Sequence, residues 1–226
     1  MANDNDIEAG SAALAPENIG VNPASDPAAE PASFAFDEES EREIGWILGK
    51  YPPSKKASAV IPILYLVQKQ MGRAAGSAWV PRVAMDVVAA RLEVPPMRIY
   101  EVATFYFMFN MSPIGRFHLQ VCGTTPCWLR GSDEIARACR DEADVTGYKQ
   151  TSADGVFTLS EVECLGGCVN APILQVDDDY YEDLDYARTR QLLQSLRRGE
   201  RPAPGSTIGR ITSAPEGGPT TLLEVK

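Results

Sequence analysis

Histidine is almost absent from this chain of 226 residues, in which His118 is the only one. A Rieske centre needs two histidine ligands, so that class of site is excluded. A single histidine in a predicted strand also leaves no plausible Ser-His-Asp triad or Cys-His pair. We therefore expect no catalytic residue on this chain. We interpret His118 as a structural histidine.

Phosphate-binding loops and basic blocks are also missing. The chain contains neither GxGxxG nor GxxxxGK[ST], so nothing indicates that it binds a nucleotide itself. Residues 1–41 hold ten acidic residues and no Lys or Arg, while the other 21 acidic residues balance 21 Lys and Arg. Because a nucleic-acid-binding protein needs a basic face, we expect no nucleic-acid partner.

Long apolar runs are missing as well. The longest, Ala59–Val67, is far too short to cross a bilayer, so we expect no membrane span. The first residues lack the basic and apolar regions of a secretory signal. We therefore expect a soluble or peripheral protein in a reducing cytosol, where cysteines bind metal more often than they form disulfides.

Composition and apolar periodicity divide the chain into four parts. Residues 1–35 are rich in Ala, Pro, Asn and Asp and predict a disordered acidic tail. Residues 36–112 carry apolar stripes of helical period and predict a helical domain. Its helices are expected over 44–51, 60–71, 80–92 and 96–106, with breaks at Pro52, Gly72 and Gly76.

Residues 113–199 change to an α/β pattern. Alternating apolar residues predict strands over 117–122 and 155–162 and a hairpin of 173–176 with 180–182. Helices are expected over 133–143, with Ser132 as N-cap, and over 185–198, while 123–131 is predicted to be a loop. The order β-α-β-β-β-α indicates a small α/β layer fold, followed by an extended tail over 200–226.

Four of the five cysteines form two pairs, Cys122-x4-Cys127 and Cys164-x3-Cys168. Each pair follows a predicted strand, and the helix and strand between them can return the second loop to the first. Four converging thiolates suit a [2Fe–2S] cluster, but zinc also uses such pairs. Spacing alone leaves both open, so a zinc-stabilised interaction module stays an alternative. Cys139 lies inside a predicted helix without a partner, so we interpret it as a buried structural cysteine.

The loops around the cysteine pairs are rich in small and hydroxyl residues. Gly123, Gly166 and Gly167 lie beside the cysteines and would let backbone N–H groups approach a negatively charged cluster. Thr124 could add a hydroxyl donor. We therefore expect these four residues to surround the ligands.

Two other segments leave alternatives open. The helices expected over 80–106 resemble a helix-turn-helix, which keeps an iron–sulfur DNA regulator as a rival despite the near-neutral charge of residues 42–226. The aromatic run 104–109 is either a seam inside the protein or a surface for a partner.

At this point the motifs resemble a known family, the 24 kDa subunit of respiratory complex I, NADH:quinone oxidoreductase. The resemblance covers about residues 38–226. Segment 154–172 contains Cys-Leu-Gly-Gly-Cys at 164–168, and segment 122–128 reads Cys-Gly-Thr-Thr-Pro-Cys-Trp. The segments 101–106 and 209–222 also match the family.

The resemblance implies a thioredoxin-like [2Fe–2S] ferredoxin domain behind an N-terminal helical bundle. It implies that Cys122, Cys127, Cys164 and Cys168 ligate one [2Fe–2S] cluster. It also implies docking onto a flavoprotein subunit that carries FMN and binds NADH, in the peripheral arm of complex I at the cytoplasmic face of a bacterial inner membrane. Relatives of this module serve NAD-linked formate dehydrogenases and hydrogenases, which stay as alternatives.

Overall fold

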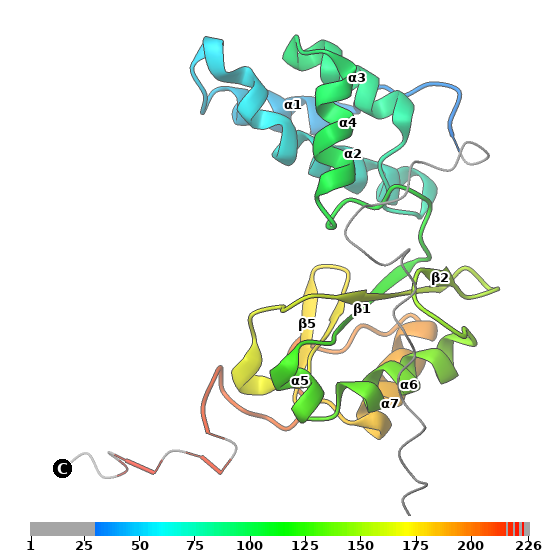
Figure 1. The fold of residues 1–226 in the computed structure, drawn as a ribbon, viewed down its shortest axis with the longest axis vertical. Helices are drawn as coiled ribbons and strands as arrows, with labels where there is room; N and C mark the ends of the chain where they lie inside the picture. The colour runs from blue at the N-terminus through cyan, green and yellow to red at the C-terminus, as the bar shows by residue number, and fades with distance from the viewer. Residues whose placement is uncertain (1–29, 216, 219, 222, 224–226) are drawn as a thin grey trace, which may run out of the picture. The chain divides into compact units, whose positions relative to one another are not determined.

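The structure is a computed structural model that describes residues 30–215, 217, 218, 220, 221 and 223. Contacts divide the chain into two compact units, Met1–Pro113 and Ile114–Lys226 (Figure 1). Most of the predicted acidic tail, residues 1–29, lies outside the described residues. The domain limits expected from the sequence stay predictions.

The first unit is built of helices. Their bounds are α1 Glu38–Leu48, the 3-10 turn η2 Pro53–Ala59, α2 Val60–Ala75, α3 Arg82–Leu92 and α4 Pro96–Phe105. The side chain of Asp37 accepts a hydrogen bond from the Ser40 N–H at 2.8 Å and caps α1, a contact typically worth about 1 kcal/mol. Pro96 occupies the first turn of α4, where its missing N–H costs little.

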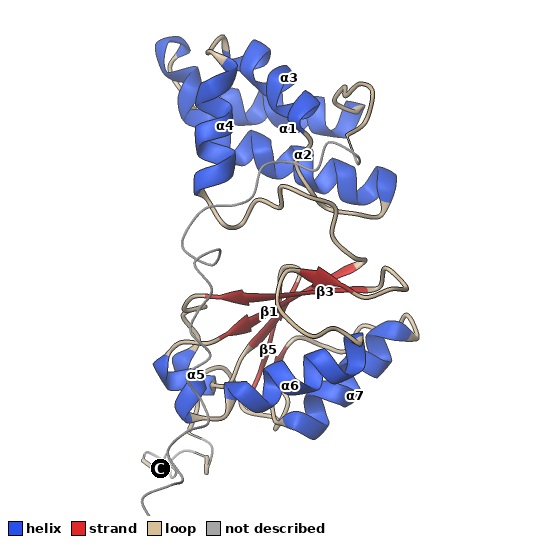
Figure 2. Ribbon diagram, turned by 45° about the vertical axis from the view of Figure 1, so that its right-hand side comes forward, coloured by secondary structure: helices blue, strands red, loops and turns tan. Residues whose placement is uncertain are grey.

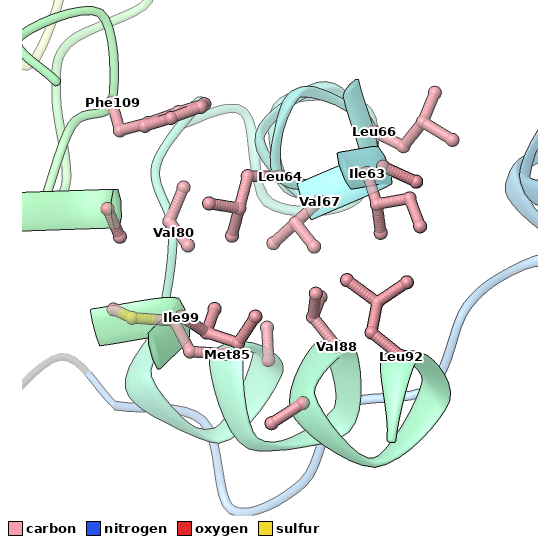
Figure 3. Packing of buried hydrophobic residues seen from close by; sticks show 14 of the residues in the cluster. Ile63, Leu64, Leu66, Val67, Val80, Met85, Val88, Leu92, Ile99 and Phe109 are labelled. Carbon is pink, nitrogen blue, oxygen red and sulfur yellow. The ribbon is translucent and has the colours of Figure 1, made fainter. Parts of the chain in front are cut away.

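The helical stripes meet in one apolar core (Figure 3). Val67 and Ile63 of α2 point toward Val88 and Leu92 of α3, and all four side chains are buried. The expected helices are therefore present. The predicted break at Gly72 is wrong, because α2 continues to Ala75 and ends only at Gly76, whose φ of 71° is left-handed.

The second unit is a mixed sheet with helices against it (Figure 2). The strands are β1 Phe117–Cys122, β2 Gln150–Thr151, β3 Phe157–Val162, β4 Leu174–Val176, β5 Asp179–Glu182 and β6 Gly205–Ser206, in the order β2-β3-β1-β4-β5-β6. The helices are α5 Thr125–Leu129, α6 Ser132–Ala143, the 3-10 turn η3 Cys168–Asn170 and α7 Tyr186–Arg197. Helices α6 and α7 lie together against one face of the sheet (Figure 2).

The core of this unit lies between that face and the two helices. Leu119 of β1, Leu159 of β3, Ile135 of α6 and Leu193 of α7 are fully buried in it. Cys139 lies in the same core, as predicted from its place inside a helix. In the described part of the chain, no helix has both the length and the apolar character needed to cross a membrane.

Three local expectations are wrong. The predicted loop 123–131 contains the short helix α5. Ser132 is the first buried residue of α6 and not its N-cap, a place taken by Gly131 at a φ of 93°. The strands β2 and β6 were not expected, because two residues are too short to show an alternating pattern.

Strands β1 and β3 are parallel neighbours in the middle of the sheet, and this arrangement positions the candidate site. Their register runs from Phe117 opposite Phe157 to Cys122 opposite Val162. Because the carboxyl ends of parallel neighbours meet at one edge of a sheet, the loops after Cys122 and after Val162 must start side by side.

Candidate metal centre

The four paired cysteines leave the sheet at this edge. Cys122 ends β1 and Cys127 lies in α5, directly after it. Cys164 lies in the loop after β3, and Cys168 begins η3. The structure thus brings together two loops that are separated by the 36 residues between Cys127 and Cys164.

The second pair lies at the surface. The sulfurs of Cys164 and Cys168 are 3.7 Å apart, and both residues are exposed. The backbone N–H of Gly166 donates to the Cys164 sulfur at 3.4 Å. This N–H is the largest influence on the pKa of Cys164, which lies below its usual value, while the neighbouring Cys164 sulfur raises the pKa of Cys168.

The first pair is buried. Burial is the main cause that raises the pKa of Cys127 to about 12, followed by its hydrogen bond with Cys122. Burial also acts to raise the pKa of Cys122, but hydrogen bonds from Thr124 and from the backbone of Leu165 outweigh it and lower that pKa. In each pair the pKa of one thiol, Cys122 or Cys164, is therefore lowered, which favours the thiolate.

Thr124 connects the two pairs. Its hydroxyl oxygen lies 3.3 Å from the Cys122 sulfur, and the same side chain helps to lower the pKa of Cys164 in the other loop. The backbone of Leu165, in the second loop, helps to lower the pKa of Cys122, in the first. Polar groups of each loop therefore favour the thiolate form of a cysteine in the other.

The glycines expected around the cysteines have different roles. Gly166 has a φ of 82°, which a side chain would strain. A Cβ on Gly167 would overlap the Cδ1 of the buried Ile173, and a Cβ on Gly123 would overlap the Glu161 carboxylate. The N–H of Gly123 donates to Val162 and not to a sulfur. Gly166 is thus a donor, whereas Gly123 and Gly167 provide space.

One contact was missed from the sequence. The hydroxyl of Tyr180 in β5 donates to the Leu165 carbonyl at 2.9 Å and holds the second loop against the sheet. No local pattern could show this, because the two residues belong to different elements.

The lone histidine lies away from the cysteines in the sheet. His118 Nε2 lies 2.9 Å from the Ser160 hydroxyl on the neighbouring strand. Burial lowers its pKa to about 4, so the imidazole is neutral at physiological pH. These contacts are those of a structural histidine.

The donor set fits a diiron cluster. Such a cluster takes two thiolates on each of two irons and is stabilised by N–H groups near its sulfurs. The cysteines form two pairs of this kind, and backbone donors lie beside them. Because each iron takes only two of the four thiolates, the cluster does not need three side chains around one ion, and the described residues contain no such group of three or more His, Cys, Asp or Glu.

Comparison with known sequences is consistent with this donor set. The family model of the thioredoxin-like [2Fe–2S] ferredoxins matches residues 44–197. A subunit of the NADH-quinone oxidoreductase of Rickettsia typhi is 51% identical over 162 residues, which cover 72% of this chain and 92% of the relative. The corresponding protein of Rickettsia bellii is 48% identical over 165 residues, covering 73% of this chain and 95% of the relative.

Comparison with solved structures supports the fold. An NAD+-reducing [NiFe]-hydrogenase in its H2-reduced state superposes with a TM-score of 0.54 at 18% identity. The match covers 63% of this chain but only 23% of the hydrogenase chain, so the likeness is one of fold. The expected helical segment followed by a thioredoxin-like domain is confirmed, and family membership implies one [2Fe–2S] cluster.

The family match spans most of the described residues, and the sequence relatives are covered almost over their full length. The chain therefore belongs to the thioredoxin-like [2Fe–2S] ferredoxin family, together with these NADH-quinone oxidoreductase subunits.

Proposed function

We propose that this chain is the one-electron carrier of an NADH-oxidising assembly and that Cys122, Cys127, Cys164 and Cys168 hold its [2Fe–2S] cluster. The convergence of the two cysteine pairs at the carboxyl ends of β1 and β3 carries the proposal. All four ligands are thiolates, which disfavours a Rieske-type potential and favours a low one, about −400 mV in plant-type relatives.

The bound cluster supplies one-electron chemistry. The residues of this chain would bind the cluster and stabilise its negative charge. The thiolates would bind the irons, and the N–H groups of Leu165 and Gly166 and the hydroxyl of Thr124 would stabilise the added negative charge. No catalytic residue is assigned to the chain, because substrate chemistry would take place on its partner.

Exposed apolar side chains next to the ligand loops support a partner. Trp128 and Leu129 in α5 are 57% and 70% exposed, Val169 beside Cys168 is 64% exposed, and Ile211 is 80% exposed. Ile211 follows Arg210, which donates to the Val169 carbonyl, so the tail residue belongs to the same region. We define these four residues as the apolar rim. A rim of this kind is typical of a surface that another protein covers.

We propose that the partner is the flavoprotein subunit that carries FMN and binds NADH. Electrons would pass singly between its flavin and this chain, in the peripheral arm of complex I at the cytoplasmic face of a bacterial inner membrane. The identity of 51% with an NADH-quinone oxidoreductase subunit favours this assembly over a hydrogenase or formate dehydrogenase, since the hydrogenase likeness is one of fold.

Anaerobic purification of the full chain tests the cluster. We expect about two irons and two acid-labile sulfides per chain, a visible absorption band and an EPR signal after reduction. Cys122→Ser and Cys164→Ser should abolish or strongly weaken these signals, whereas Cys139→Ser, in the core, should keep them. A colourless protein that contains zinc and no sulfide would overturn the proposal.

A further inference from the structure

The C-terminal tail folds back onto the loop that carries the second cysteine pair. Strand β6 pairs in parallel with β5, Gly205 opposite Tyr181 and Ser206 opposite Glu182. A turn then brings Arg210 to the loop, where its Nη2 donates to the Val169 carbonyl at 2.9 Å. Val169 directly follows Cys168. We call residues 205–214 the clasp.

A buried ion pair anchors the clasp. The side chains of Arg210 and Asp183 are only 8% and 3% exposed. Arg210 Nε donates to one Asp183 oxygen at 2.9 Å, and its Nη2 donates to the other. Burial acts to raise the pKa of Asp183, but hydrogen bonds from Arg210 and Ser206 outweigh it and lower that pKa, so the carboxylate stays charged. The two-pronged contact fixes the guanidinium in one orientation.

The orientation of Arg210 joins three segments. Its Nη1 donates to the Ala214 carbonyl within the tail at 3.0 Å, while its other nitrogens reach Asp183 after β5 and Val169 after Cys168. Removal of the guanidinium would leave the buried Asp183 carboxylate without its charged partner and the Val169 carbonyl without this donor.

Asn170 makes a second connection between loop and tail. Its Nδ2 donates to Glu182 Oε2 at 2.6 Å and to the Thr212 carbonyl at 2.8 Å. Both neighbours are acceptors, which fixes the orientation of the amide. Its Oδ1 is buried and has no hydrogen-bond partner among the described residues. Asn170 thus leaves one acceptor unpaired while it ties the ligand loop to β5 and to the clasp.

The clasp and the loop do not pack closely everywhere. A cavity of about 220 Å³ lies there, lined by Gly166, Asn170, Glu182 and Ser213 among others. Apolar packing therefore does not fill this space, and the polar contacts of Arg210 and Asn170 hold the two segments together. The loop needs such support, since it contains Gly166 and Gly167 and its cysteines are exposed, unlike the buried Cys122 and Cys127.

We propose that Arg210 and Asn170 are positioning residues, which tie the C-terminal clasp to the Cys164–Cys168 loop and so set the geometry and protection of this half of the cluster site. The inference rests on the proposed function, because it concerns the same four thiolates. It gives the C-terminal tail a role in cluster retention, through contacts of Arg210 and Thr212, which follow the last ligand by about 40 residues.

The test compares two arginines of the tail. Arg201 also bonds to two aspartates, Asp177 at 3.1 Å and Asp179 at 2.9 Å, and donates to the Val176 carbonyl, but none of these partners lies in the ligand loop. Arg201→Gln is therefore a matched control for Arg210→Gln. Both variants are made in the full chain and loaded with cluster under anaerobic conditions.

Three measurements are made on each protein: the rate of cluster loss in the presence of a chelator, the EPR g-values with the midpoint potential, and the melting temperature. Arg210→Gln should lose its cluster at least tenfold faster than wild type and change the EPR spectrum and potential. Arg201→Gln should stay within twofold of the wild-type rate with an unchanged spectrum, even where its melting temperature falls.

The outcomes separate this inference from the proposed function. Wild type without iron would refute the proposed function. Wild type with its cluster, together with equal behaviour of the two arginine variants, would refute the clasp alone. If Arg210→Gln does not fold, Asn170→Ala and Arg210→Lys replace it as test variants. Each should show faster loss and an altered spectrum, and a change confined to the melting temperature would count against positioning.

Discussion

The hydroxyl of Thr124 lies 3.3 Å from the sulfur of Cys122, and the same side chain helps to lower the pKa of Cys164 in the other loop. Sulfur hydrogen bonds stabilise the reduced, more negative cluster and thereby raise its potential. Thr124→Val keeps the shape of the side chain and removes the donor. We expect the midpoint potential to fall by on the order of tens of millivolts.

A redox titration followed by visible absorbance measures this fall. The exposed neighbour Thr125 offers the control, since Thr125→Val makes the same chemical change outside the contact between the loops. Equal potentials for Thr124→Val and wild type would show that this hydroxyl does not adjust the cluster.

Gly167→Ala tests the close approach between the second loop and the core. The new methyl group would overlap the Cδ1 of Ile173, which is fully buried. Overpacking of this kind typically costs about 1–3 kcal/mol of unfolding free energy. Ile173→Val removes the overlapping carbon, so the double variant should be less destabilised than the sum of the single variants. Additive effects in chemical denaturation would contradict this contact.

His118 predicts a loss of stability in mild acid. Burial lowers its pKa to about 4 from 6.5. Between these values the unfolded chain binds a proton that the folded chain does not, so this contribution is full above pH 6.5 and is lost as the pH falls toward 4. The loss should be on the order of 1–3 kcal/mol.

Unfolding curves at pH 7.5 and pH 5.0 measure this effect as a difference between wild type and His118→Gln, which cancels the acid sensitivity of the rest of the protein. The variant should lose less stability between the two pH values. An identical loss in both proteins would rule out His118 as the cause.

Substitutions in the apolar rim should weaken assembly with the partner and leave cluster binding unchanged. Replacement of Trp128 and Leu129 by Ser should weaken co-purification with the flavoprotein subunit at least tenfold, because exposed apolar anchors contribute most to such contacts. The cluster content should not change, since both side chains are exposed and neither is a proposed ligand. Trp46→Ser, in the first unit and 68% exposed, is the control. Retained co-purification of the double variant would remove the rim from the interface.

Much of the architecture could be predicted because periodicity reports which side chains are buried. Leu64 and Val67 repeat at the helical period and lie in the helical core, and strand 117–122 has the expected bounds. Helix α5 could not be predicted, since five residues with a proline show no repeat. Strands β2 and β6 exist only through pairing with β3 and β5, which local sequence cannot show.

The site could be predicted in part for a similar reason. The spacing of Cys122, Cys127, Cys164 and Cys168 indicates two loops, and the structure shows that parallel β1 and β3 bring them together. The ligand assignment itself stays a prediction until iron is measured. The contacts of Arg210 with Asp183 and Val169 span 27 and 41 residues and leave no trace in any short motif.

The different exposure of the two pairs has a consequence for how the protein matures. Cys122 and Cys127 are shielded, whereas the sulfurs of Cys164 and Cys168 face solvent 3.7 Å apart. In a chain without iron, an oxidant such as oxygen would therefore remove two electrons and two protons from the exposed thiols, joining them in a disulfide, sooner than from the shielded pair. In a newly made chain, oxidation of Cys164 and Cys168 therefore competes with insertion of the cluster.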